Sequence, residues 1–129
     1  MQFSEDNVTQ LLLESNVCKP PGPDNIHPRV LKECAKELTL PLFLLFKKSL
    51  SAGRLPAAWK EGHVTPIFKK ESRSDVGNYR PVTLMSVCCK TMEKLTRDAL
   101  MKHMNDCGYL SDTQHGFIKG RSCTAQLLE

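Results

Sequence analysis

The 129-residue sequence lacks the short motifs that mark several common classes of functional site. None of its six cysteines forms a C-x-x-C pair, which argues against a zinc ribbon or zinc knuckle. Neither G-x-x-x-x-G-K nor G-x-G-x-x-G occurs, so the two common glycine-rich phosphate-binding loops are absent. No two aspartates are adjacent, and the one adjacent acidic pair, Glu5 and Asp6, is placed to favour the start of a helix.

Long hydrophobic runs are also missing. The longest, Leu38–Phe46, is interrupted by Thr39 and Pro41 and is far shorter than the roughly 20 residues needed to cross a bilayer. The first eight residues, MQFSEDNV, are acidic and do not resemble a signal peptide. We therefore expect no membrane partner and an intracellular protein with reduced thiols, in either the nucleus or the cytoplasm.

The composition that is present fits one domain with a modest core, because 40% of the residues are hydrophobic. The net charge is +4, with a surplus of one positive charge over residues 1–59 and of three over residues 60–129. A mildly basic second half suits a polyanion such as nucleic acid. A slightly basic soluble surface explains the same charge equally well.

Helical periodicity covers most of the chain on both sides of a central segment. The expected helices lie at residues 5–16, 28–53 and 86–105. Ser4 and Ser86 are the expected caps of the first and third helices. In the second helix, Pro41 is expected to restart the helix and Gly53 to end it. Three prolines and a glycine within residues 19–24 predict a rigid loop.

Two features of the core follow from these elements. Trp59, the only tryptophan, is expected to anchor the core beneath the central segment, with base stacking as the less favoured alternative. Of the adjacent Cys88 and Cys89, we expect one to be buried and the other to lie at the side of its helix.

The central segment, Val64–Leu84, is predicted to form an antiparallel β-hairpin. Two runs rich in β-branched and aromatic residues are separated by Ser, Asp, Gly and Asn, which favour turns. Pro66 and Pro81 cannot donate to a ladder, so both runs are expected to be edge strands or strand ends. The predicted fold class is α+β, predominantly helical, with one antiparallel β-hairpin.

Positive charge gathers on this predicted hairpin. The segment contains only two carboxylates, Glu71 and Asp75, but four cations, which are Lys69, Lys70, Arg73 and Arg80. This excess predicts an anion-binding surface. Lys90 is a further candidate, because it is the lysine of the long helix closest to the hairpin. Near the C-terminus, Lys119 and Arg121 flank a glycine that would let the backbone approach a partner closely.

Four sequence blocks occur in order and cover nearly the whole chain from Lys19; they are KPPGPDNIHPRVLKEC, LPAAWKEGHVTPIFKK, NYRPVTLMSVCCKTMEKL and LSDTQHGFIKGRSC. Together they closely resemble the reverse transcriptase of non-LTR (LINE-type, jockey-like) retrotransposons. The resemblance implies that residues 1–129 are a partial reverse transcriptase domain, comprising the fingers subdomain and a truncated palm. It also implies template RNA, primer DNA and nucleotide triphosphates as partners.

The resemblance further implies roles for individual residues. Lys69, Lys70 and Arg80 match the positions that grip the triphosphate of the incoming nucleotide. A guanidinium offers a planar fork for two phosphate oxygens, and a lysine a mobile point charge. The block containing Lys119 and Arg121 matches one that contacts the template strand and primer region. The remaining candidate contacts to nucleic acid are Arg73 and Lys90.

The metal-binding aspartates implied by the resemblance belong to palm motifs that follow the GRS block, and neither motif occurs in the sequence. Template-directed phosphoryl transfer needs two divalent metals held by clustered carboxylates. We therefore expect no catalytic residue, metal ligand or endonuclease domain in this chain, although Mg²⁺ is implied for the full-length family.

The function predicted from the sequence is that of a truncated RNA-directed DNA polymerase fragment, which retains phosphate contacts but does not polymerise. One alternative is a non-catalytic module that binds nucleic acid. A second alternative is a protein-interaction module that completes, or competes with, a polymerase supplied elsewhere. Its apolar helices would stay exposed without the palm, which would show as self-association. Because fingers normally pack on a palm, we also expect marginal stability.

Overall fold

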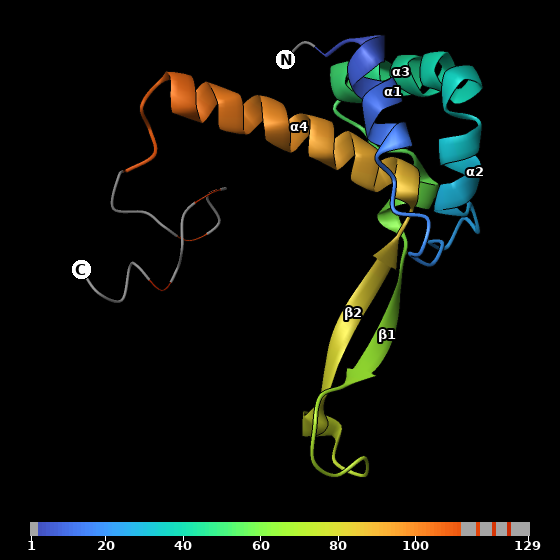
Figure 1. The fold of residues 1–129 in the computed structure, drawn as a ribbon, viewed down its shortest axis with the longest axis vertical. Coiled ribbons are helices and arrows are strands. Elements are labelled where there is room, and N and C mark those ends of the chain that lie inside the picture. The colour runs from blue at the N-terminus through green and yellow to red at the C-terminus, as the bar shows by residue number, and fades with distance from the viewer. Residues whose placement is uncertain (1–2, 112–115, 117–119, 121–123, 125–129) are drawn as a thin grey trace. The chain divides into compact units, whose positions relative to one another are not determined.

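The structure is a computed structural model that describes residues 3–111 together with Gly116, Gly120 and Thr124 (Figure 1). The chain divides into two units, Met1–Thr96 and Arg97–Glu129. The first unit contains three helices, a β-hairpin and the first half of the long helix α4 (Val87–Asp106). The second unit contains the rest of α4. Among the described helices, none is long and apolar enough to cross a membrane.

Helix α1 (Glu5–Leu13) begins at the predicted cap. The Oγ of Ser4 accepts a hydrogen bond from the Asn7 backbone N–H at 3.3 Å, and Asn7 Oδ1 accepts from the Ser4 N–H at 2.9 Å. This reciprocal capping box satisfies two backbone donors at the start of the helix. The helix ends at Leu13, earlier than the predicted residue 16.

The next helical region is interrupted at a different residue from the one predicted. Helix α2 (Pro28–Glu33) and helix α3 (Ala35–Ala52) meet at Cys34, while Pro41 lies inside α3. Pro41 removes only the hydrogen bond to the Glu37 carbonyl, and both residues are exposed, so water can reach that carbonyl. Burial of neighbouring α3 residues in the core therefore outweighs the local preference of proline.

The C-terminus of α3 is closed as predicted by Gly53, which has a φ of 60°. Its N–H donates to the Leu50 carbonyl at 3.3 Å, and the Arg54 N–H donates to the Ser49 carbonyl at 3.1 Å. The left-handed conformation required for this closure strains any residue with a Cβ.

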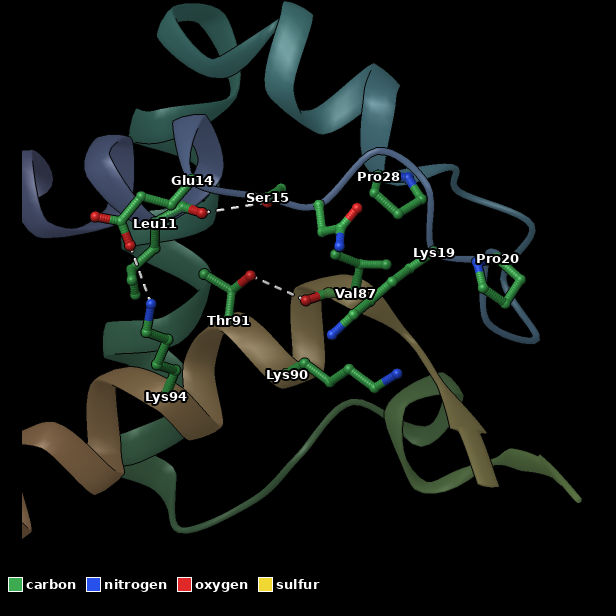
Figure 2. A pocket seen from close by; sticks show the side chains of 11 residues that line it. Leu11, Glu14, Ser15, Lys19, Pro20, Pro28, Val87, Lys90, Thr91 and Lys94 are labelled. Carbon is green, nitrogen blue, oxygen red and sulfur yellow. Dashed lines mark hydrogen bonds and ion pairs between the residues drawn. The ribbon is translucent and has the colours of Figure 1, made fainter. Parts of the chain in front are cut away.

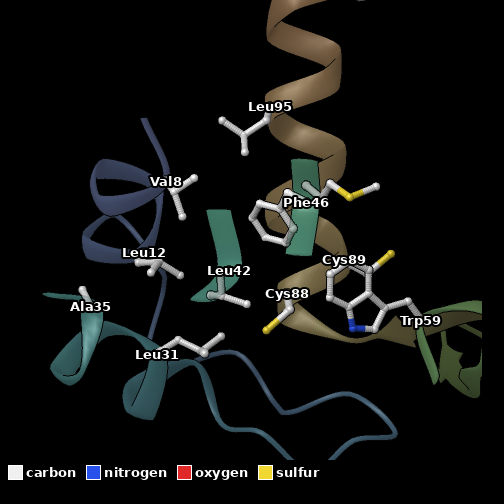
Figure 3. Packing of buried hydrophobic residues seen from close by; sticks show 11 residues of the cluster. Val8, Leu12, Leu31, Ala35, Leu42, Phe46, Trp59, Cys88, Cys89 and Leu95 are labelled. Carbon is white, nitrogen blue, oxygen red and sulfur yellow. The ribbon is translucent and has the colours of Figure 1, made fainter. Parts of the chain in front are cut away.

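The hydrophobic core joins α1, α2, α3 and α4 with the short 3₁₀ helix η1 (Ala57–Lys60) (Figure 3). Phe46 is fully buried, and its ring meets that of Trp59 edge-on with centroids 5.7 Å apart. The predicted core role of Trp59 is thereby confirmed. The buried hydrophobic residues are Val8, Leu12, Leu31, Ala35, Leu42, Phe46, Trp59, Cys88, Cys89, Met92 and Leu95.

Cys88 and Cys89 are both buried, so the prediction that one would lie at the side of α4 is wrong. Both belong to the buried cluster formed with residues of the other helices and η1. The proline-rich loop approaches the chain just before α4. Gly22 approaches so closely that a Cβ at this position would lie 2.5 Å from the Met85 carbonyl carbon. Only glycine permits that backbone-to-backbone contact.

The central segment forms the predicted hairpin of β1 (Gly62–Phe68) and β2 (Tyr79–Met85), which run antiparallel and side by side (Figure 1). Gly62 pairs with Met85 at one end and Phe68 with Tyr79 at the other. These two strands make up the only sheet within the described residues. The α+β class with one antiparallel hairpin is confirmed.

In the second unit, α4 ends at a glycine in the same way as α3. Gly108 has a φ of 64° and donates to the Asn105 carbonyl at 3.1 Å, while the Tyr109 N–H donates to the Met104 carbonyl at 3.0 Å. Leu100, in this half of α4, is 52% exposed.

Candidate phosphate-binding hairpin

The register of the hairpin sorts its side chains onto two faces. Residues directly opposite each other in an antiparallel pair share a face, and successive residues alternate between faces. One face carries His63, Thr65, Ile67, Arg80, Val82 and Leu84. The other carries Val64, Pro66, Phe68, Tyr79, Pro81 and Thr83.

The turn end of the hairpin extends the first of these faces by one residue. The Lys69 N–H donates to the Asn78 carbonyl at 2.8 Å, which continues the ladder beyond β1. By alternation, Lys69 lies on the same face as Ile67 and Arg80, and it is the diagonal neighbour of Arg80 across the strands. The hairpin therefore brings one lysine and one arginine to a single face.

The loop between the strands is held by its own hydrogen bonds. Asp75 Oδ1 accepts from the Gly77 N–H at 2.8 Å, and the Asn78 side-chain amide donates to the Ser72 carbonyl at 2.9 Å. Glu71 adopts a left-handed conformation, with a φ of 70°. These contacts fix the loop and hence the position of the ends of both strands.

Two of the four predicted cations are engaged within the hairpin. Lys70 Nζ lies 3.6 Å from Glu71 Oε1 in an exposed ion pair. The Arg73 guanidinium carbon lies 5.3 Å from the centroid of the Phe68 ring, which suits a cation–π contact. The Tyr79 hydroxyl donates to the Arg73 carbonyl at 3.0 Å, and its ring lies 5.5 Å from that of Phe68. Arg73 thus helps to build the loop.

The other two cations, Lys69 and Arg80, are exposed. Within the described part of the chain, no hydrogen bond or ion pair engages the Lys69 ammonium or the Arg80 guanidinium. Two unneutralised cations on one face attract an anion, and together they can donate several charge-assisted hydrogen bonds to phosphate oxygens.

The remaining predicted contacts lie elsewhere. Lys90 is exposed near the start of α4, where it lines a pocket together with Lys19. Sequence analysis did not predict a role for Lys19, because no local spacing links it to Lys90, which lies far away in the chain. Lys119 and Arg121 lie outside the described residues, so their predicted roles stay predictions.

Two aspartate carboxylates, those of Asp24 and Asp75, serve local backbone geometry. Asp24 Oδ1 accepts from the Ile26 N–H at 3.2 Å, much as Asp75 holds the hairpin loop. In the part of the chain that the structure describes, no three side chains of His, Cys, Asp or Glu lie together so that they could hold a metal ion.

The buried thiols are poor nucleophiles. Burial, and secondly the nearby Asp24 carboxylate, raise the pKa of Cys88 to about 11. Burial and then Glu93 also raise the pKa of Cys89. Because the thiolate is the reactive form, both side chains are suited to packing in the core.

Comparison with known proteins links the chain to retrotransposon polymerases, although no protein-family model matches it. It is 31% identical over 110 residues to a probable RNA-directed DNA polymerase from transposon BS of Drosophila melanogaster. It is 28% identical over 113 residues to the RNA-directed DNA polymerase from mobile element jockey of the same organism. It is 29% identical over 119 residues to a retrovirus-related Pol polyprotein from type-1 retrotransposable element R1 of Bradysia coprophila.

These alignments cover 84%, 87% and 91% of the chain, in that order, but only 12% of each relative. The chain therefore spans a small part of the length of the curated relatives it matches. Over most of its own length, this chain is similar to the RNA-directed DNA polymerases of non-LTR, jockey-like retrotransposons.

Proposed function

We propose that this chain is the fingers region of a retrotransposon RNA-directed DNA polymerase and that its hairpin binds phosphate groups of nucleotide and nucleic acid. One observation carries the proposal: Lys69 and Arg80 lie on one face of the hairpin, exposed and unpaired within the described residues. The names of the relatives, which are RNA-directed DNA polymerases, support the choice of ligand.

A purely structural role explains these two cations poorly. Arg73, in the same hairpin, packs over an aromatic ring, and Lys70 has a carboxylate partner. Lys69 and Arg80 have neither, and an exposed arginine or lysine without a partner contributes little to stability. Their shared face therefore supports a binding role.

We further propose that the chain binds these ligands without polymerising nucleotides. Polymerisation needs clustered carboxylates for two metal ions. The described Asp24 and Asp75 carboxylates instead accept hydrogen bonds from backbone N–H groups of their own turns. A primer-extension assay with Mg²⁺ or Mn²⁺ tests this, and template-dependent synthesis by the purified chain would overturn it.

The test of the hairpin compares two double variants that remove the same charge. Lys69→Gln with Arg80→Gln removes the unpaired cations, whereas Lys70→Gln with Arg73→Gln removes the engaged ones. We expect the first variant to bind a fluorescent single-stranded RNA and a nucleoside triphosphate about tenfold more weakly at low salt. The affinity of the second variant for the same ligands should fall by about threefold or less, because each of its cations already has a partner.

Equal losses of affinity in the two double variants would show that the hairpin binds only through its net charge. Binding to RNA should also weaken steeply as salt rises, because each phosphate contact releases counterions. Salt-independent binding, or none, would contradict the proposed ligand. Thermal unfolding of each variant serves as the control, since all four side chains are exposed.

A protein-binding role is the second candidate function. Leu40 and Leu44 lie one turn apart on α3 and are 51% and 54% exposed, which favours an apolar contact with a partner or a second copy. Size-exclusion chromatography over a range of concentrations tests self-association. A mass that stays at 14.5 kDa throughout would contradict it.

A further inference from the structure

A pocket of about 190 Å³ lies between the end of α1, the segment that follows it and the first turns of α4 (Figure 2). Its walls include apolar contacts from Leu11, Pro28 and Val87. Typical small-molecule sites occupy about 300 to 1,000 Å³. This pocket is smaller, so it suits one chemical group of a larger ligand better than a whole nucleotide.

The charged residues of the pocket give it a net charge of +2, because three lysines face one glutamate. Lys94 Nζ lies 3.1 Å from Glu14 Oε2, so this pair is neutralised. Lys19 and Lys90 have no ion pair with any residue that the structure describes. Figure 2 shows Lys94 extending toward Glu14, whereas Lys19 and Lys90 extend into the space beside Val87.

Two hydroxyls of the pocket already donate their protons to backbone carbonyls, so neither has a donor left for a ligand. The Thr91 hydroxyl donates to the Val87 carbonyl at 2.9 Å, and the Ser15 hydroxyl donates to the Leu11 carbonyl at 3.2 Å. Asn16 Oδ1 accepts from the Cys18 N–H at 2.9 Å, which leaves its amide nitrogen as a donor. The remaining donors are the Asn16 amide and the Lys19 and Lys90 ammonium groups, which a negatively charged hydrogen-bond acceptor would satisfy.

We propose that this pocket is a second phosphate-binding site, in which Lys19 and Lys90 hold one phosphate group of a nucleic-acid strand or of a nucleoside triphosphate. The site deepens the proposed function and rests on it for the choice of ligand. The start of α4 adds to the attraction, because the N-terminal end of a helix favours negative charge. Strand β2 leads directly into α4, so the sequence from Arg80 to Lys90 joins the hairpin face to the pocket.

Three variants test the pocket. Lys19→Gln with Lys90→Gln removes its unpaired cations, and Lys36→Gln with Lys48→Gln removes two exposed lysines of α3 as a control with the same charge change. Glu14→Gln acts in the opposite direction, because it removes the one negative charge and releases Lys94 from its ion pair. Each variant is titrated with a single-stranded RNA oligonucleotide and, separately, with a nucleoside triphosphate.

We expect the pocket variant to bind at least one probe roughly tenfold more weakly at about 50 mM salt, and Glu14→Gln to bind the same probe more tightly. The α3 control should change binding by about twofold or less. The probe that responds identifies the source of the phosphate. If it is RNA, the slope of log K against log salt should also fall by about 0.7, as expected when one phosphate contact to a single strand is lost.

The proposal is overturned if the pocket variant and the α3 control bind both probes equally. In that case the hairpin variants still decide the proposed function on their own. Conversely, the hairpin variants could bind like the parent chain while the pocket variant loses binding. The proposed hairpin function would then fail and the pocket would stand.

Discussion

The helical core and the β-hairpin of the first unit differ in how far their side chains are buried. The core brings eleven buried hydrophobic residues together from four helices and η1. Neither strand of the hairpin contributes a fully buried residue, and Val64 is 65% exposed. An isolated two-stranded hairpin is marginally stable at best in water. The difference indicates that the core residues are selected for packing, whereas the hairpin residues are available for contacts with a ligand.

The largest expected change in stability comes from a substitution that leaves a cavity in the core. Phe46→Ala should lower the free energy of unfolding by about 3 to 5 kcal/mol, because a fully buried ring in contact with Trp59 is lost. Ile67→Ala in β1 should cost less than about 1 kcal/mol, since that side chain is 39% exposed. Urea unfolding followed by circular dichroism measures both. Similar losses would mean that the hairpin carries as much stability as the core.

The junction between the two regions gives the next largest effect. Gly22→Ala places a Cβ 2.5 Å from the Met85 backbone, so it should destabilise the fold by about 2 to 3 kcal/mol. Gly53→Ala meets no atom within 4 Å and carries only the strain of its left-handed conformation, about 1 kcal/mol. Thermal unfolding of the two variants compares them. A smaller loss for Gly22→Ala would contradict the close contact between loop and strand end.

A third effect concerns the dependence of stability on pH. The pKa of Cys88 is about 11 in the folded chain, against 9.0 for the unperturbed thiol. Between these values the unfolded chain has lost the proton and the folded chain retains it. Stability is therefore fully present below pH 9 and falls as pH rises from 9 to 11, by up to about 1.4 kcal/mol per pH unit.

Unfolding free energies at pH 8 and pH 10.5 measure this loss for the parent chain and for Cys88→Ala. The variant should lose part of the slope and retain the contribution of Cys89, whose pKa is also raised. An unchanged slope would show that Cys88 is accessible to solvent in the folded chain.

The sequence predicted best what local chemistry determines. Ser4 caps α1 because its hydroxyl reaches a backbone N–H three residues away, and Gly53 ends α3 because it tolerates a positive φ. The hairpin was predictable because its strands and turn residues are consecutive. Each of these signals is complete within a few residues.

The errors and omissions arise from contacts between distant segments. Pro41 stays inside α3 because the core holds that helix, and Cys88 and Cys89 are both buried because they pack in the same core cluster as residues of the other helices. Sequence alone could not show that Lys69 lies on the same face of the hairpin as Arg80, because that placement depends on the strand register. It gave Lys19 no role, because its neighbour in the pocket comes from α4.

The pairing of Pro66 with Pro81 affects whether the strands of the hairpin can pair with a strand of another molecule. The bond from Lys69 to Asn78 marks a hydrogen-bonded pair, so by alternation the proline pair is a non-hydrogen-bonded one, whose N–H positions face outward. Both outer edges therefore lack a donor at their midpoint without losing a bond inside the ladder. A strand from another molecule would meet a gap on either side, which protects an exposed hairpin against edge-to-edge aggregation.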